Sequence, residues 1–461
     1  MEQGLRFDGE LIRRYDRAGP RYTSYPTAPH FHEGFTEADY RACAQASNAS
    51  GRPLSLYFHI PFCDTLCFYC ACNKVPTKDR SRAAPYLEAL HREIALQGAL
   101  YDPSRTVEQL HWGGGTPTFI SHEQMRALMA QTRRHFRLRE DDEGEYSIEV
   151  DPREVGEGTL ALLRELGFNR LSMGVQDLDP RVQRAVNRIQ SPEQTFRVLE
   201  EARAVGFRSI SVDLMYGLPF QSRESFLRTL DRIVEAGPDR LSVFNYAHLP
   251  ELFYPQRRIR AEDLPPPAEK LAILEGAIQR LEEAGYVYIG MDHFARPDDE
   301  LAVAQREGTL HRNFQGYSTH AECDLVAMGV TAISMVGDCY SQNLKELGPY
   351  QERLAQERLP VLRGVRLDAD DRLRRELITR LICHFELDLA ELGARHGIDP
   401  EAYFAEELAD LAPMEADGLL ERQGLRLRVL PAGRLLIRNI CMVFDRYLRR
   451  RQGPQRYSKV I

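Results

Sequence analysis

The sequence predicts an α/β protein: a partial or complete TIM-like (β/α) barrel of parallel strands, with an N-terminal arm and a small mainly helical, winged-helix-like C-terminal domain. Three observations support this fold class. From about residue 54 to 295, short apolar runs alternate with longer stretches of helical periodicity. The gaps between these runs, roughly 25 to 45 residues, each fit a crossover helix, which implies a parallel sheet. Six or seven such repeats favour a barrel over a doubly wound sheet.

The expected barrel strands are apolar runs that end close to polar side chains. They cover residues 54–60, 107–112, 146–150, 170–175, 209–215, 240–246 and 286–291. Helix starts between them carry capping residues followed by proline, at Asp151-Pro152, Asp179-Pro180 and Ser191-Pro192. Such an acceptor side chain satisfies the first free N–H groups, and proline suits the first helical position.

Three parts are expected along the chain: an N-terminal arm over 1–50, the barrel over 51–355 and the helical C-terminal domain over 356–461. The segment 19–28 holds two prolines and several hydroxyl side chains, so it is either a surface strap or a lid. Beyond residue 360 we expect two or three helices over 368–412, a two-stranded element over 419–430 and a final helix over 436–450. A winged helix invites a DNA-binding interpretation, but an accessory domain fits the acidic chain better.

Composition indicates a soluble globular protein with no export signal. The chain has 461 residues, 43% of them hydrophobic, and a formal net charge of −8. It contains no apolar run long enough to span a membrane, and its first ten residues lack the apolar core of a signal peptide. The negative charge argues against general nucleic-acid binding. We therefore expect a cytoplasmic protein with neither a membrane nor a nucleic-acid partner.

Four of the nine cysteines lie within ten residues, at Cys63, Cys67, Cys70 and Cys72. Thiols at this density form disulfides, bind zinc or hold an iron–sulfur cluster. Structural zinc sites more often use two separated C-x2-C pairs, and a reducing compartment disfavours disulfides. The first three cysteines, C-x3-C-x2-C, suit a cluster with one open iron. In this spacing the segment resembles radical S-adenosylmethionine (SAM) enzymes.

Further candidate groups lie after the expected strands, where barrels place their chemistry. The glycine run of Trp112-Gly-Gly-Gly-Thr-Pro-Thr118 leaves a bare backbone that can approach a ligand, although alone it fits a tight turn equally well. Polar residues near other strand ends are Tyr57, Glu149, Gln176, Asp213 and Tyr246. Gln176 and Asp213 can equally be polar groups satisfied within the barrel mouth. Asp151 is expected to act as a helix cap, and the isolated cysteines as small buried hydrophobes.

Longer runs extend the resemblance to nearly the whole chain. They include Pro20-Arg-Tyr-Thr-Ser-Tyr-Pro-Thr27, the cysteine loop, His111-Trp-Gly-Gly-Gly-Thr-Pro-Thr118, Ser147-Ile-Glu-Val-Asp-Pro-Arg153 and Ser172-Met-Gly-Val-Gln176. In these runs the chain resembles the oxygen-independent coproporphyrinogen III oxidases of bacteria. The resemblance implies that a 5′-deoxyadenosyl radical drives decarboxylation of two propionates of coproporphyrinogen III to the vinyl groups of protoporphyrinogen IX, within haem biosynthesis. It also implies one [4Fe–4S] cluster and two SAM molecules.

The resemblance also assigns residues. It implies that Cys63, Cys67 and Cys70 hold the cluster. The first SAM would contact Tyr57, Gly114, Glu149 and Ile333. The second would lie along Tyr69, Gly115, Thr116, Gln176, Arg188, Asp213 and Ala247. Tyr69 stands where some relatives have phenylalanine. Cys72 is a candidate catalytic residue for redox or proton transfer, or else a packing residue.

Other functions stay open at this point. Related haem-binding chaperones share the barrel and the three-cysteine loop but generally lack Cys72 and the N-terminal arm. An anaerobic haem-modifying radical enzyme and a zinc-stabilised regulatory protein are further alternatives. For an oxidase of this kind, we expect a flavodoxin or ferredoxin as the electron donor. We also expect the protein to be a monomer. Arg21 and Arg312 are the expected partners of substrate carboxylates.

Overall fold

The computed structural model describes residues 4–449 and groups the chain into two compact units. The barrel unit comprises Phe31–Pro265 and Glu322–Arg366. The C-terminal unit comprises the described residues up to His30, Pro266–Ala321 and the described residues from Leu367 onwards. The three-part division expected from the sequence stays a prediction. Within residues 4–449, no helix is both long and apolar enough to cross a membrane.

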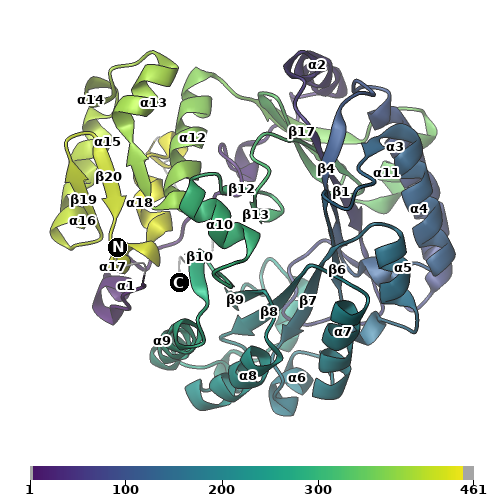
Figure 1. Ribbon diagram of the computed structural model, residues 1–461, viewed down its shortest axis with the longest axis horizontal. Helices are drawn as coiled ribbons and strands as arrows, with labels where there is room; N and C mark the ends of the chain where they lie inside the picture. The colour runs from purple at the N-terminus through teal and green to yellow at the C-terminus, as the bar shows by residue number, and fades with distance from the viewer. Residues whose placement is uncertain (1–3, 450–461) are drawn as a thin grey trace. The chain divides into compact units, whose positions relative to one another are not determined.

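A parallel sheet forms the centre of the barrel unit, with strand order β9-β8-β7-β6-β4-β1-β14. Figure 1 shows it curving as a partial TIM-like barrel, with helices along its outer side. The strands are β1 (Leu54–Ile60), β4 (Thr106–Gly114), β6 (Glu145–Val150), β7 (Arg170–Gln176), β8 (Ser209–Tyr216), β9 (Arg240–Asn245) and β14 (Asp324–Met328). Each of the first six lies on a run expected from the sequence.

The connecting helices include two that begin at an expected cap–proline pair, Asp179-Pro180 and Ser191-Pro192. The connecting helices are α3 (Ala83–Gly98), α4 (His122–His135), α5 (Thr159–Glu165), α6 (Pro180–Ala185), α7 (Pro192–Ala204) and α8 (Arg223–Ala236). Asp179 accepts hydrogen bonds from the first N–H groups of α6, and Ser191 accepts one at the start of α7. Asp151 caps one 3₁₀ turn, Pro152–Glu154, rather than a full α-helix.

Strand alternation gives the sheet one apolar and one polar face. Leu56, Phe58 and Trp112 are fully buried, and the Trp112 ring contacts Phe58 and Phe168. On the other face, Tyr57 of β1 pairs in register with His111 of β4, which pairs with Ser147 of β6. A neighbouring row joins Ser55, Gln109 and Glu145 through side-chain hydrogen bonds of 2.9 and 3.0 Å. Polar groups of successive strands therefore meet on one face.

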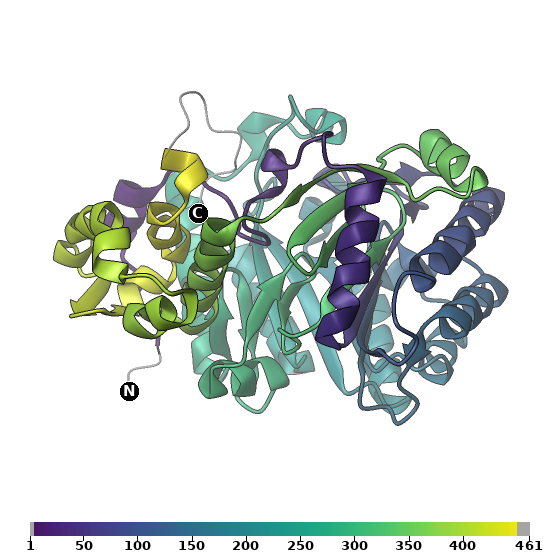
Figure 2. The ribbon, with the colours of Figure 1, turned by 90° about the horizontal axis from the view of Figure 1, so that it is seen from above.

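An antiparallel extension continues the sheet beyond β14. Its strands are β15 (Ile333–Val336), β16 (Cys339–Asn343) and β17 (Val361–Arg366), with α11 (Leu347–Ala355) between the last two. The helix α2 (Glu37–Ser47) packs against β15 and β16 (Figure 2). The short strand β5 (Arg137–Leu138) pairs with β4.

One expected barrel strand pairs differently from the others. The run at 286–291 forms β10 (Val287–Gly290), which belongs to the C-terminal unit and pairs antiparallel with β11 (His293–Ala295). The parallel neighbour on the free side of β1 is β14, whose five residues are all buried. A five-residue apolar run carries little periodicity, so composition alone did not separate these two strands.

The C-terminal unit is mainly helical. Its remaining elements are α1 (Gly9–Tyr15), α9 (Pro267–Glu283), α10 (Glu300–Glu307), β12 (His311–Asn313), β13 (Gly316–Ser318), α12 (Ala369–His384), β18 (Glu386–Asp388), α13 (Leu389–His396), α14 (Pro400–Tyr403), α15 (Ala405–Asp410), α16 (Ala412–Ala416), β19 (Leu420–Gln423), β20 (Arg426–Val429), α17 (Pro431–Arg434), α18 (Ile437–Val443) and α19 (Arg446–Arg449). The expected hairpin is β19–β20, joined by β18 in a three-stranded sheet. The expected last helix is divided into α18 and α19, and position 450 lies outside the described residues.

The first segment of the chain belongs to this C-terminal unit. Tyr15 donates a hydrogen bond to Asp417 (2.7 Å), and Tyr22 donates one to Asp445 (3.0 Å). The buried guanidinium of Arg438 donates to the carbonyl oxygen of Pro20 at 2.9 Å. These contacts hold residues 15–22 against the rest of the C-terminal unit.

Candidate functional site: a cysteine loop at the polar face of the barrel

The four clustered cysteines lie on the loop that follows β1. The loop is closed at its base by two short parallel strands, β2 (Phe62–Cys63) and β3 (Val75–Pro76). Backbone bonds from Val75 to Pro61 (2.7 Å) and from Thr77 to Cys63 (2.8 Å) secure this base. All four thiols are free, with Cys67 buried and Cys72 exposed. The loop thus displays its thiols on a fixed frame.

Hydrogen-bond donors surround the sulfur of Cys67. The guanidinium groups of Arg153 and Arg188 each place a nitrogen 3.6 Å from it. Both arginines also pair with Asp151, at 2.6 and 3.0 Å. Burial opposes the negative charge of Asp151, but the two arginines outweigh it and hold the pKa of this carboxyl below its usual range. The result is a buried support behind one cysteine in which two guanidinium groups share one carboxylate, leaving one positive charge in excess.

The other cysteines have different neighbours. The Thr116 hydroxyl lies 3.7 Å from the sulfur of Cys63, and burial raises the pKa of that thiol to about 12. A hydrogen bond from Cys72 lowers the pKa of Cys70, and Lys74 donates to the Cys70 carbonyl oxygen at 2.8 Å. Cys72 therefore lies beside Cys70 at the exposed edge of the loop.

The glycine run at the end of β4 packs directly against the cysteine loop. The Gly115 N–H donates to Ile60 and the Thr116 N–H to Phe62, each at 2.8 Å. A Cβ atom at Gly115 would lie 2.6 Å from the Pro61 carbonyl oxygen. Gly114 has φ of 120°, a conformation that other residues rarely adopt. The glycine run can therefore approach the cysteine loop this closely only because it has no side chains.

Glu149 lies at the centre of the polar face. One of its oxygens accepts the Gly114 N–H at 3.2 Å, and the other lies 3.4 Å from His111 Nε2. Burial disfavours its charge, but the hydrogen bonds and positive potential from His111, and the Gly114 N–H, lower its pKa. Glu149 is therefore an anion held in place at the end of β6.

Tyr57 and His59 extend this network along β1. The Tyr57 ring stacks on His111 at 5.7 Å, and its hydroxyl lies 3.1 Å from His59 Nδ1. His59 Nε2 lies 3.0 Å from the Asn73 carbonyl oxygen, which can only accept, so Nε2 carries a proton. Burial lowers the pKa of His59, which keeps the ring neutral with Nδ1 free to accept the Tyr57 proton.

A second group of polar residues lies along β7 and β8. Arg188 donates to the Gly174 carbonyl oxygen at 2.5 Å, and Ser172 donates to Asp213 at 3.3 Å. Burial raises the pKa of Asp213 to about 6. The side-chain oxygen of Gln176 and the Nε atom of Arg188 are buried without a hydrogen-bond partner among the described residues. Such orphaned groups are costly unless a ligand satisfies them.

The structure thus joins two sets of the residues predicted from sequence. Tyr57, Gly114 and Glu149 share one network, and Cys67 and Arg188 share another. Gly115 and Thr116 join the end of β4 to the start of the cysteine loop through their backbone N–H groups. The Tyr69 backbone carbonyl oxygen accepts a hydrogen bond from the Gln256 side-chain amide at 3.0 Å. Ala247 follows β9 and Ile333 begins β15. Their contacts to a cofactor stay predictions.

Four residues of this site were not among those expected from the sequence. His59 and His111 share the polar face with Tyr57, and strand alternation combined with register would have found them. The capping pattern predicted only a local role for Asp151 and no role in the site for Arg153. The cap is real, with the Arg153 N–H donating to Asp151 at 3.0 Å, but the same carboxylate also holds Arg188.

The donor set fits a cluster and a SAM molecule. Three thiols on one loop can supply cluster ligands. The glycine run 113–115 exposes backbone where a side chain would collide, and Gln176 and Arg188 offer buried, unsatisfied polar atoms. A negative carboxylate, Glu149, can hold an ammonium group.

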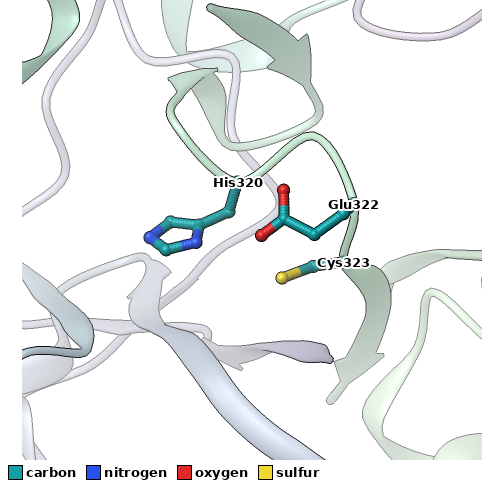
Figure 3. Close-up of side chains that lie close together, drawn as sticks. All are labelled: His320, Glu322 and Cys323. Carbon is teal, nitrogen blue, oxygen red and sulfur yellow. The ribbon is translucent and has the colours of Figure 1, made fainter. Parts of the chain in front are cut away.

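A separate group of potential metal ligands lies at the turn after β13. One ligand atom each from His320, Glu322 and Cys323 lie within 4.8 Å of one another (Figure 3). The Glu322 carboxylate is exposed, and exposed acidic groups commonly lie near other potential ligands without an ion. We assign no metal to this group.

Comparisons with known proteins agree with the geometry. Residues 57–233 match the Radical SAM superfamily model, and residues 367–436 match the HemN C-terminal domain model. The fold and site therefore define a radical SAM enzyme. The chain is 56% identical to the oxygen-independent coproporphyrinogen III oxidase of Pseudomonas aeruginosa, over 100% of both chains, and 52% identical to that of Escherichia coli over 100% and 99%. The chain belongs to the oxygen-independent coproporphyrinogen III oxidase family.

A solved structure shows the same fold. Coproporphyrinogen III oxidase (HemN) from Escherichia coli, described as a radical SAM enzyme, superposes with a TM-score of 0.92 at 51% identity. The match covers 97% of this chain and 100% of that one.

Proposed function

We propose that this protein converts two propionate side chains of coproporphyrinogen III to the vinyl groups of protoporphyrinogen IX without oxygen. For each side chain, a hydrogen atom leaves the β-carbon, carbon dioxide leaves from the carboxylate, and one electron passes to an acceptor as the C=C bond forms. The supporting observation is the full-length match to curated oxidases, combined with the cysteine loop backed by buried Arg153 and Arg188.

Cys63, Cys67 and Cys70 are the proposed ligands of the [4Fe–4S] cluster. When bound, the cluster and SAM supply a carbon radical able to remove the β-hydrogen. The protein provides position and exclusion of water. Arg153 and Arg188 donate toward the Cys67 sulfur, and the Thr116 hydroxyl lies near that of Cys63. Such donors and local charge set a cluster's potential.

Glu149 is the proposed anchor of the first SAM. Its carboxylate is already fixed by Gly114 and flanked by His111, so it needs little reordering to accept an ammonium donor. Tyr57, Gly114 and Ile333 complete this proposed site. The second SAM is assigned to Tyr69, Gly115, Thr116, Gln176, Arg188, Asp213 and Ala247.

Arg312 is the proposed partner of a substrate carboxylate. It is buried, and its Nε and Nη1 atoms have no hydrogen-bond partner among residues 4–449. Its guanidinium lies 4.8 Å from the centroid of the Tyr317 ring. A buried guanidinium with unused donors favours a carboxylate. Arg21 instead already pairs with Asp292, which makes it the weaker candidate.

The proposed electron donor follows from the chemistry of SAM cleavage. Each SAM cleavage requires one electron from outside, for which a flavodoxin or ferredoxin is the proposed donor. We expect a monomer in the cytoplasm, to be checked by light scattering and cell fractionation. Cys72 is a proposed redox or proton-transfer residue at the edge of the loop.

An anaerobic assay tests the reaction. Reconstituted protein, SAM, a reductant and coproporphyrinogen III should yield protoporphyrinogen IX together with 5′-deoxyadenosine and carbon dioxide. The Cys67→Ser variant is the matched control and should give none of these products. Haem binding without turnover would instead favour a chaperone, and 5′-deoxyadenosine formation without decarboxylation would point to another substrate.

A further inference from the structure

Exposed apolar side chains lie on two segments that bond to the cysteine loop. Among residues 4–449, four large hydrophobic side chains are strongly exposed, and three belong to the barrel unit: Ile189 at 66%, Leu252 at 69% and Tyr254 at 71%. The fourth, Tyr403, lies in the C-terminal unit. Single exposed apolar residues are ordinary, whereas a group of them marks an interaction surface.

Both segments that carry these residues make contacts with the cysteine loop. From segment 181–189, the Val186 carbonyl oxygen accepts the Phe68 N–H at 2.9 Å, and Asn187 donates to the Leu66 carbonyl oxygen at 2.8 Å. From segment 249–258, Gln256 donates to the Tyr69 carbonyl oxygen at 3.0 Å. The Arg258 guanidinium lies 5.1 Å from the centroid of the Phe68 ring. We call segments 181–189 and 249–258 together with Phe68 the rim.

The rim is positively charged although the chain is acidic. It exposes four arginines, Arg181, Arg184, Arg257 and Arg258, against one exposed glutamate, Glu251. The whole chain carries a formal charge of −8. Arginine and aromatic residues around an apolar centre are typical of protein interfaces, and such a local potential favours an acidic partner.

We propose that the rim is the docking surface for a small acidic one-electron carrier protein of the flavodoxin or ferredoxin class. This inference rests on the proposed function, because a cluster held by Cys63, Cys67 and Cys70 must receive an electron from outside for each SAM cleaved. In the transfer, the carrier is oxidised by one electron and the cluster is reduced by one. Docking here brings the carrier to the segments that bond directly to residues 66–69 of the loop.

The test uses the full-length reconstituted protein and a bacterial flavodoxin in its hydroquinone form. Arg184→Glu combined with Arg257→Glu should weaken flavodoxin binding tenfold or more by calorimetry, and slow cluster reduction by flavodoxin in stopped-flow absorbance. Reduction of the same cluster by dithionite should keep its rate. Added salt should weaken binding to the unchanged protein, because it screens exposed charges.

Matched controls separate docking from general charge effects. Arg92→Glu combined with Arg134→Glu makes the same charge change at exposed positions of α3 and α4 and should leave flavodoxin binding unchanged. Leu252→Ser combined with Tyr254→Ser removes the apolar part of the rim without changing charge and should also weaken binding.

Specific outcomes would overturn the proposal. These are unchanged binding in both rim variants, an equal loss in the control pair, a change confined to self-association, or a raised KM for coproporphyrinogen III with dithionite as reductant. Neither binding nor cluster reduction requires substrate turnover. Failure of the proposed reaction, seen as missing protoporphyrinogen IX with an intact cluster, is therefore distinguishable from failure of docking.

Discussion

The Nη1 atom of Arg188 lies 3.6 Å from the sulfur of Cys67, and the same atom donates to Asp151 at 3.0 Å. One guanidinium thus connects a proposed cluster ligand to a carboxylate that also caps the turn after β6. A positive charge beside a cysteine sulfur stabilises the more negative, reduced state of a cluster.

Replacement of Arg188 by glutamine should therefore make the midpoint potential of the cluster more negative, whereas Arg188→Lys should shift it less. The glutamine variant should also lose roughly 1–3 kcal/mol of stability, because Asp151 and the Gly174 carbonyl oxygen lose a buried donor. A redox titration followed by electron paramagnetic resonance measures the potential. Arg203→Gln, at an exposed position on α7, is the control, and an unchanged potential in Arg188→Gln would contradict the assignment.

Three of the four loop cysteines should be required for cluster binding, and the fourth should not. Cys63→Ser, Cys67→Ser and Cys70→Ser should each lose the cluster, because each removes a proposed ligand. Cys72→Ser should retain it, since Cys72 lies at the exposed edge of the loop. Iron and sulfide analysis with absorbance spectroscopy reads out all four variants. An intact cluster in any of the first three, or its loss in Cys72→Ser, would show that the ligand set is different.

Much of the barrel could be predicted because its signals are local. Apolar runs located six parallel strands, and cap–proline pairs located the starts of α6 and α7. The place of β14 could not be predicted this way, because its pairing with β1 joins residues about 270 positions apart. Val287–Gly290 has the same apolar character but a different partner.

Sequence patterns marked the candidate ligands of the site, but not the side chains that support them. Cysteine spacing marked Cys63, Cys67 and Cys70, and strand ends marked Glu149 and Asp213. Strand register places His111 opposite Tyr57, which a sequence alone does not state. Arg153 and Asp151 looked like the start of a helix, and only the fold shows that they also support Cys67.

Glu149→Gln should weaken SAM binding to the reconstituted protein. The substitution keeps the shape but removes the negative charge, and a charge-assisted hydrogen bond contributes about 1.5–3 kcal/mol, or roughly tenfold to a hundredfold in Kd. Calorimetry under anaerobic conditions measures the affinity. Glu145→Gln is the matched control, because Glu145 lies on the same strand and face but bonds to Gln109. Equal effects in both variants would remove Glu149 from the binding site.

Arg312→Gln should raise the KM for coproporphyrinogen III about tenfold or more, because a buried charged hydrogen bond to a substrate carboxylate is lost. Arg312→Lys should recover part of the affinity, since it keeps the charge without the forked geometry. Arg21→Gln should have a smaller effect because Arg21 pairs with Asp292. Arg306→Gln, at an exposed position on α10, is the control in steady-state kinetics. An unchanged KM in both Arg312 variants would exclude this residue as a carboxylate partner.

Glu93 should make the stability of the protein depend on pH. This carboxyl group on α3 is fully buried and accepts hydrogen bonds from Gly329 (2.8 Å), Asn343 (2.7 Å) and Tyr350 (2.6 Å). Burial raises its pKa from 4.5 to about 7 despite these donors. Between these two values the folded state holds a proton that the unfolded state has lost. The stabilisation is therefore complete below about pH 4.5 and is lost as the pH rises through about 7, by roughly 3 kcal/mol.

Urea unfolding of the apo-protein between pH 5 and 8 measures this dependence, with each variant compared with the unchanged protein at the same pH. Glu93→Gln carries no ionisable group, so its free energy of unfolding relative to the unchanged protein should rise with pH over this range. Glu88→Gln, an exposed position on the same helix, should give a difference that does not vary. A flat difference for Glu93→Gln would mean that the carboxylate stays charged when folded and that its three donors outweigh the effect of burial.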